Sequence, residues 1–159
     1  MKLNFLFPGK TREPFMAEGI KEYLHKLKPM IQVKEVILKG AAVPPGAGAA
    51  AETLAKAKEA GTILEHCGTS DYLIALDVAG ELMSSVELSN KFEKLRDSSV
   101  RVVNVVVGGP WGLDESLIHR ADLRLSLGPM TFPHELARVM ILEQIYRTFT
   151  IINHMPYHK

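Results

Sequence analysis

Three short segments combine glycine with apolar residues, a composition that lets the backbone approach a bound ligand closely. They are residues 76–80 (LDVAG), 108–112 (GGPWG) and 127–132 (LGPMTF). The second has neither usual phosphate-loop spacing, contains no lysine, and loses a backbone donor at Pro110. Together the segments indicate an apolar slot edged with backbone N–H and C=O groups, which suits a neutral purine better than a polyphosphate. The alternative is that they are three ordinary turns.

Each of these segments lies at the end of a predicted strand. Apolar runs predict strands over residues 2–7, 31–38, 72–78, 100–107 and 123–127. Helical spacing or alanine-rich composition predicts helices over 12–28, 49–67, 84–96, 114–119 and from about 131 to 152. This alternation predicts an α/β fold with a mostly parallel sheet flanked by helices. Ligands bind beyond the carboxyl ends of the strands in such sheets, which is where the three segments lie.

Local signals refine two of the helices. Ser84 or Ser85 is expected to cap the helix over 84–96, and Thr131 is expected to cap the last helix, with Pro133 in its first turn. The last helix is expected to bury five apolar side chains, those of Leu136, Val139, Met140, Ile145 and Phe149.

Length and composition favour one soluble domain spanning residues 1–159. No apolar run approaches the roughly 20 residues that a membrane helix needs. The apolar stretch near the start, in MKLNFLFPGK, is also too short for a signal peptide. Cys67 is the only cysteine, so neither an internal disulfide nor a cysteine-based zinc site is expected. A cytoplasmic protein without a membrane partner is the prediction.

The formal net charge of +1 conceals an uneven distribution. Residues 1–40 hold eight basic and four acidic side chains, residues 41–100 five and nine, and residues 101–159 six and five. The basic N-terminal part could meet phosphate, although such asymmetry is also common on ordinary protein surfaces.

Several motifs resemble the RlmH (YbeA-like) family of bacterial ribosomal RNA methyltransferases. They are Leu76-Asp77-x-x-Gly80, Gly108-Gly109-x-x-Gly112-Leu113, Leu125-Ser126-Leu127, Met130-Thr131-Phe132-Pro133-His134, Arg138-Val139, Glu143-Gln144-x-Tyr146-Arg147 and Pro156-Tyr157-His158-Lys159. The match covers the whole chain and is densest from residue 72 onward.

This resemblance implies a SPOUT-type α/β fold with a C-terminal trefoil knot, and a homodimer. It implies a methyltransferase that uses S-adenosyl-L-methionine, without a metal, to methylate the ring nitrogen N3 of a pseudouridine in 23S large-subunit ribosomal RNA within the ribosome. The donor contacts implied by the matching motifs are Leu76, Gly108, Leu127, Gly128, Pro129, Met130, Thr131 and Phe132.

On the acceptor side, the resemblance makes His158 and Tyr157 candidates for contact with RNA or for catalysis. A histidine titrates near neutrality, and a tyrosine ring can stack on a base. Arg138 is a third candidate for contact with RNA or the acceptor; the alternative is a role at the surface or at a dimer interface. Arg147 follows Glu143 by four residues and is expected to form a helical ion pair with it. His134 could be structural, and Trp111 is expected to pack beneath its loop more than to cover the donor.

Two other functions stay open. One is a non-catalytic α/β module that binds nucleotide or RNA. The other is a Rossmann-type methyltransferase of small molecules, which normally has a glycine-rich loop after its first strand that Phe7-Pro8-Gly9-Lys10 does not provide.

Overall fold

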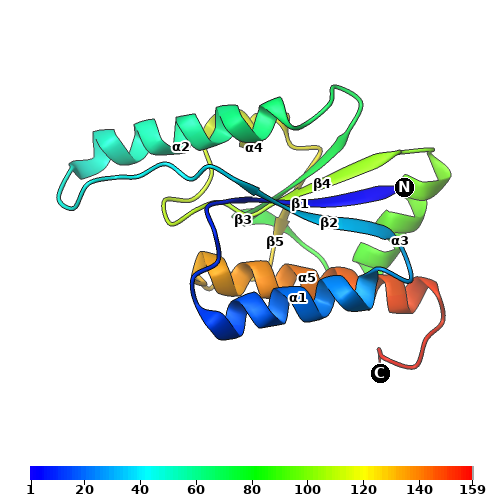
Figure 1. The fold of residues 1–159 in the computed structure, drawn as a ribbon. Coiled ribbons are helices and arrows are strands. Elements are labelled where there is room, and N and C mark those ends of the chain that lie inside the picture. Colours follow the sequence, from blue (N-terminus) through cyan, green and yellow to red (C-terminus); the bar gives the residue numbers. More distant parts are fainter. Residues whose placement is uncertain (159) are drawn as a thin grey trace.

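Five parallel strands form one sheet at the centre of the molecule (Figure 1). The structure is a computed structural model and describes residues 1–158. The strands are β1 (Lys2–Pro8), β2 (Gln32–Leu38), β3 (Tyr72–Leu82), β4 (Val102–Val106) and β5 (Leu123–Ser126), in the spatial order β2-β1-β4-β3-β5. The predicted α/β class with a parallel sheet is confirmed.

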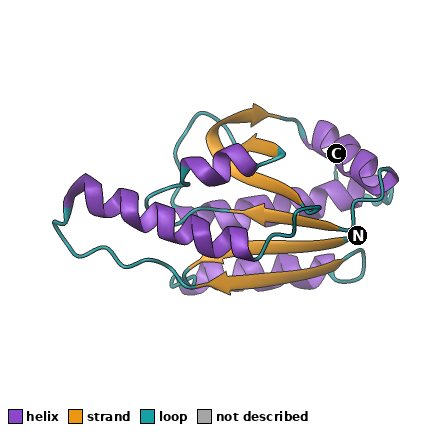
Figure 2. Cartoon of the chain, turned by 90° about the horizontal axis from the view of Figure 1, so that it is seen from above, coloured by secondary structure: helices purple, strands orange, loops and turns teal. Residues whose placement is uncertain are grey.

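The helices cover both faces of this sheet (Figures 1 and 2). They are α1 (Pro14–Leu27), α2 (Gly48–Glu65), α3 (Ser85–Asp97), α4 (Glu115–Arg120) and α5 (His134–Ile152). Helices α1 and α5 lie side by side on one face, and α3 packs against α5 there, while α2 and α4 cover the other face. No helix within residues 1–158 is long and apolar enough to cross a membrane.

The central strands are apolar because both of their faces are covered. Along β1, Leu3, Phe5 and Phe7 pack toward α1, α3 and α5, whereas Leu6 belongs to the core beneath α2 and α4. In β4, Val103 and Val105 face the first core, and Val106 faces the second. Alternate residues of a strand point to opposite faces, so a strand between two helical layers needs apolar residues on both.

A polar network interrupts this apolar centre and fixes the register of the strands. Asn104 is fully buried in β4 and lies opposite Asn4 of β1. The Asn4 amide donates to the Asn104 side-chain oxygen at 2.8 Å, and the Asn104 amide donates to the Asp71 carboxyl at 3.0 Å. A shift of one residue would break these hydrogen bonds and turn the apolar side chains to the wrong face.

The helix caps differ from the prediction at one of the two sites. Ser84 caps α3: its hydroxyl accepts from the Glu87 N–H, while the Glu87 carboxyl accepts from the Ser84 N–H at 2.7 Å. The prediction that Thr131 caps the last helix is wrong, because α5 starts at His134 with Pro133 at the cap position. Thr131 instead belongs to the loop that precedes the helix.

Helix α5 also buries a different face from the predicted one. Ile145 and Phe149 are buried as expected, but Leu136, Val139 and Met140 are only half-buried. Ala137, Arg138, Ile141 and Leu142 are buried in their place. The helix is apolar around much of its circumference, so spacing alone does not reveal which side meets α1, α3 and the sheet.

Strand β3 is longer than predicted because it continues past an irregularity between Leu76 and Glu81. At Gly80 the backbones of β3 and β5 come close together. A Cβ on Gly80 would lie 2.7 Å from the carbonyl carbon and oxygen of Arg124. Glycine is therefore required here by contact with backbone, which cannot move aside easily.

We expect Gly80→Ala to lower the free energy of unfolding by about 1–3 kcal/mol, the usual cost of overpacking. Gly61, in α2, is the matched control because a Cβ there would meet nothing within 4 Å. Gly61→Ala is expected to raise the free energy of unfolding by about 0.5–1 kcal/mol, since alanine favours helix. Urea denaturation measures both. Equal stability of Gly80→Ala and the unmodified chain would contradict the steric argument.

Candidate functional site

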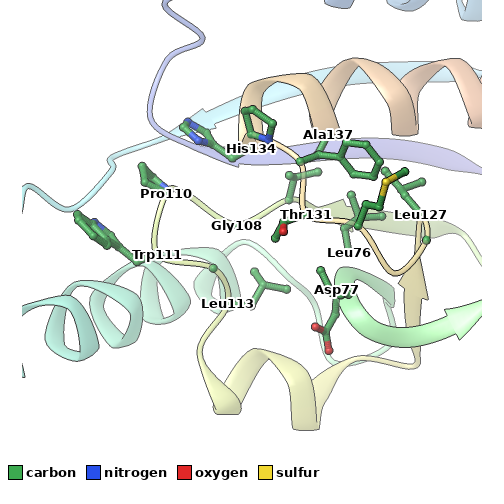
Figure 3. A pocket seen from close by; sticks show the side chains of 18 of the residues that line it. Leu76, Asp77, Gly108, Pro110, Trp111, Leu113, Leu127, Thr131, His134 and Ala137 are labelled. Carbon is green, nitrogen blue, oxygen red and sulfur yellow. The ribbon is translucent and has the colours of Figure 1, made fainter. Parts of the chain in front are cut away.

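A cavity of about 500 Å³ opens at the carboxyl ends of β3, β4 and β5 (Figure 3). Its wall consists of Leu76, Asp77, Val78, Val107, Gly108, Gly109, Pro110, Trp111, Gly112, Leu113, Ile118, Leu127, Gly128, Met130, Thr131, Phe132, Pro133, His134 and Ala137. All three segments singled out in the sequence contribute to this wall. Of the eight expected donor-binding residues, seven line the cavity, and Pro129 is not among the lining residues.

The order of the strands brings these segments together. Strands β4, β3 and β5 are neighbours, so the loops after β4 and β5 flank the irregular end of β3. Ser126 at the end of β5 links two of the segments: its hydroxyl donates to the Val78 carbonyl at 3.0 Å and accepts from the Gly128 N–H at 3.2 Å. The cavity is therefore a product of sheet topology and of local hydrogen bonds.

The segment after β4 forms a tight turn. The Gly112 N–H donates to the Gly109 carbonyl at 3.1 Å, and Gly112 has a φ of +82°, which glycine adopts without strain. Trp111 lies on this turn, lines the cavity and is 37% exposed. The prediction that Trp111 packs beneath the loop is thus wrong, because the short turn holds its side chain at the cavity rim.

The cavity wall is mainly apolar and backbone in character. None of its described residues is lysine or arginine. The Asp77 carboxyl is paired with Arg124, which donates to it from Nη2 at 2.6 Å and from Nε at 3.1 Å. A wall of this kind favours a neutral ring system that hydrogen-bonds to backbone groups over a polyphosphate.

His134 is the ionisable side chain on the α5 side of the wall, and Figure 3 shows it near Pro110. Burial lowers the pKa of His134, and the neighbouring Arg138 guanidinium lowers it further. Both effects favour the neutral imidazole near pH 7, in which one ring nitrogen can donate and the other can accept. His134 can therefore hydrogen-bond to a ligand without adding charge to the cavity.

Arg138 does not lie where the predicted contact with RNA or the acceptor requires it. Its side chain is fully buried, and Nη2 donates to the Pro8 carbonyl at 2.7 Å. Nη1 donates to the Gly9 carbonyl at 3.1 Å and to the Thr11 hydroxyl at 3.0 Å, while the guanidinium covers the Phe7 ring. From this position it ties α5 to the loop after β1. A structural role thus replaces the expected contact with RNA or the acceptor.

The C-terminal segment lies at the opposite end of α5 from the cavity (Figure 1). The chain turns back after α5, because Tyr157 bonds to Glu143, which lies nine residues, or about 14 Å along the helix, after His134 of the cavity wall. His158 is exposed and Tyr157 half-buried. Lys159, the last residue of the terminal motif, lies outside the described residues.

Tyr157 is held by groups from the middle and second half of α5. Its hydroxyl donates to the Glu143 carboxyl at 3.1 Å, and its ring packs edge-on against Tyr146. The Arg147 guanidinium covers the ring and pairs with Glu143, which confirms the predicted helical ion pair. Burial, followed by the bond to Glu143, raises the pKa of Tyr157 to about 12. The tyrosine hydroxyl is therefore protonated at neutral pH.

Some lining residues carry no signal in the sequence. Ile118 of α4 and Ala137 of α5 have the spacing of ordinary core residues, yet both line the cavity. Only the positions of their helices over the strand ends give them this role.

Comparison with known proteins agrees with this architecture. A family model described as "Predicted SPOUT methyltransferase" matches residues 1–158. Two relatives called "Ribosomal RNA large subunit methyltransferase H" match the whole chain: that of Desulforamulus reducens is 38% identical, over 99% of its own length, and that of Acetivibrio thermocellus 37%, over all of its length.

A solved structure has the same fold. The crystal structure of a probable methyltransferase from Bordetella pertussis Tohama I superposes with a TM-score of 0.58, at 14% identity, covering 93% of this chain and 96% of that one. The match of the family model over almost the entire sequence, supported by relatives at nearly 40% identity, establishes the family. The chain belongs to the SPOUT methyltransferases.

Proposed function

We propose that this chain uses S-adenosyl-L-methionine to methylate N3 of a pseudouridine in 23S large-subunit ribosomal RNA. The observation that carries the proposal is the cavity built by the three glycine-containing segments at the strand ends. Membership of a methyltransferase family and the names of the relatives, which specify large-subunit ribosomal RNA, support it.

The cavity fits the proposed donor in size and chemistry. Its volume of about 500 Å³ lies within the range of small-molecule sites. The purine would meet apolar walls and backbone groups, held by Leu76, Gly108, Leu127, Gly128, Pro129, Met130, Thr131 and Phe132. When bound, the donor supplies an electrophilic methyl group on a sulfonium, so the reaction needs no metal to activate it.

The protein must hold the acceptor in line with the methyl group and help remove the proton from N3. His158 and Tyr157 are our candidates for this acceptor side. His158 is exposed and thus free to meet an acceptor, whereas the raised pKa of Tyr157 suits it to donating a hydrogen bond or stacking. Arg138 contributes by fixing the loop after β1.

We place the tail at the cavity of a second chain, because its Tyr157 is bonded to Glu143 and is thereby kept about 14 Å along α5 from His134 of its own cavity wall. In the proposed homodimer, the tail of one protomer reaches the cavity of its partner. Apolar side chains are available for an interface: Phe15, Leu82 and Met130 are each about two-thirds exposed. Phe15 lies in the first turn of α1, Leu82 at the end of β3 and Met130 in the loop before α5, so each is available to an interface. We also propose that the chain forms the C-terminal trefoil knot, that it is located in the cytoplasm and that it acts on the ribosome.

Donor binding is the first test. We expect the protein to bind S-adenosylhomocysteine, the demethylated donor, in titration calorimetry. Thr131→Trp should weaken this binding at least about tenfold, because an indole at the cavity mouth occupies the ligand's space. Leu54→Trp is the matched control on α2, where the side chain is 72% exposed and distant from the cavity wall. Absence of heat with the unmodified protein, for donor and product alike, would favour a non-catalytic module.

The RNA product is the second test. Ribosomes from a strain lacking this protein, incubated with it and with methyl-labelled donor, should acquire one label in 23S RNA. Mass spectrometry of nuclease fragments should place that label on N3 of a pseudouridine. Label on another base, or on a small molecule in the extract, would overturn this part of the proposal.

A mixed dimer tests the role of the tail. Deletion of residues 157–159 should abolish methylation of ribosomes in the homodimer, and Thr131→Trp should reduce it at least about tenfold when the donor is limiting. A heterodimer of the two variants, isolated with different N-terminal tags, should recover about half of the normal turnover, because one intact cavity meets one intact tail. An inactive heterodimer would mean that tail and cavity act within one chain.

A further inference from the structure

Glu59 is a buried acidic residue that the proposed mechanism leaves unused. It lies on α2 and is 5% exposed, among the apolar side chains of Ala55, Ala60 and Ile63. Its Oε1 accepts from the Ala41 N–H at 2.9 Å. Its Oε2 is buried and has no hydrogen-bond partner among residues 1–158. Such an unsatisfied oxygen destabilises a folded protein, so the role of Glu59 is not explained by stability.

The unsatisfied oxygen faces Gly109 of the cavity wall. A Cβ built on Gly109 would lie 2.9 Å from Glu59 Oε2, 3.3 Å from Oε1 and 3.5 Å from Cδ. These three nearest atoms all belong to Glu59, so its carboxyl group would have to move if Gly109 gained a Cβ. The φ of Gly109 is not positive, and its backbone conformation is therefore open to other residues. Because Gly109 lines the cavity and Glu59 does not, the Glu59 carboxyl group lies behind the cavity wall at this residue.

The same carboxyl group holds a second loop. Ala41, whose N–H it accepts, follows Gly40, and a Cβ on Gly40 would lie 3.2 Å from the Gly9 nitrogen. The loops after β2, β1 and β4 thus meet beside Glu59, as the adjacency of these strands requires. The Gly9 loop is itself fixed by Arg138 from the opposite helical layer. The Glu59 carboxyl group, which lies behind Gly109, is therefore itself held by the loop after β2.

We infer that Glu59 is a positioning residue for the donor site: its carboxyl group braces Gly109 and sets how far the Gly108–Gly112 turn recedes from the cavity. The inference rests on the proposed function for the identity of the ligand. The Glu59 carboxyl group acts through its shape, because Oε2 occupies the space beside Gly109 where a Cβ would lie and forms no hydrogen bond with the described residues.

A double-mutant cycle tests the contact. We expect Glu59→Ala to weaken binding of S-adenosylhomocysteine about tenfold, because the turn loses its support, and Gly109→Ala to do the same, because its Cβ pushes the turn into the cavity. The double variant should remain near tenfold, not a hundredfold, since Glu59→Ala also removes the three atoms nearest to the new Cβ. Additive losses would overturn the inference.

Two further variants separate positioning from a general effect on folding. Glu59→Gln keeps the shape of the side chain and an oxygen for the Ala41 N–H, so its donor affinity should stay within about twofold of normal. Glu65→Ala changes an exposed residue of the same helix and should have no effect. In turnover assays Glu59→Ala should raise the KM for the donor and leave kcat largely unchanged, because the acceptor side is intact. An equal loss for Glu59→Gln would show that charge, not shape, matters.

Trp111 provides a readout that needs no ligand. It is the only tryptophan in the chain and lies two residues after Gly109, so its fluorescence reports on this turn alone. Acrylamide quenching should increase in Glu59→Ala and stay normal in Glu59→Gln. Unchanged quenching in Glu59→Ala would overturn the brace, even if the donor were a different molecule. Conversely, increased quenching in a protein that binds no S-adenosylhomocysteine would support the brace and reject the proposed function. Should Glu59→Ala fail to fold, Gly109→Ala and Glu59→Gln carry the same comparison.

Discussion

The parallel sheet places the carboxyl ends of all its strands, and the loops that follow them, at a single edge. Strands β1 and β4 lie inside the sheet with both faces covered, which holds this edge in place. Asn4, Asn104 and Asp71 fix the register toward the other end of the strands. Because the register is fixed, the turns after β4 and β5 lie on either side of the irregular end of β3. The cavity forms between these three segments.

Two buried polar side chains secure the loops at that edge, one from each helical layer. Arg138 of α5 binds the carbonyls of Pro8 and Gly9, and Glu59 of α2 binds the Ala41 N–H. Buried polar groups of this kind are costly unless they are paired, and each retains one buried atom without a partner in the described part of the chain, Arg138 Nε and Glu59 Oε2. These two side chains therefore serve to hold the loops in place, at a cost in the stability of the fold. An apolar core could fill the same space but could not hold backbone groups at defined positions.

The length of α5 has a consequence for catalysis. Its first turn carries His134 on the cavity wall, while Glu143 and Arg147, nine and thirteen residues further along the helix, hold Tyr157. A rigid helix keeps these two groups of residues apart. In the proposed homodimer, the tail of one chain would reach the cavity of its partner.

The types and order of the helices and strands could be predicted from the sequence, because they depend on spacings of two to four residues. The three segments of the cavity were predictable for the same reason: each follows an apolar strand and contains glycine. The Glu143–Arg147 pair was predictable because its partners are four residues apart on one helix.

Burial of Arg138, the contact of Glu59 with Gly109, the exposure of Trp111 and the start of α5 at His134 depended on tertiary structure. Arg138 binds residues that lie 127 to 130 positions away in the chain. Its hydrogen bonds arise only after α5 packs beneath β1, and no local pattern encodes them. Sequence alone determined which elements form and which loops end at the site; the packing of distant segments decided which polar side chains the site encloses, because burial is a property of all the neighbours in space.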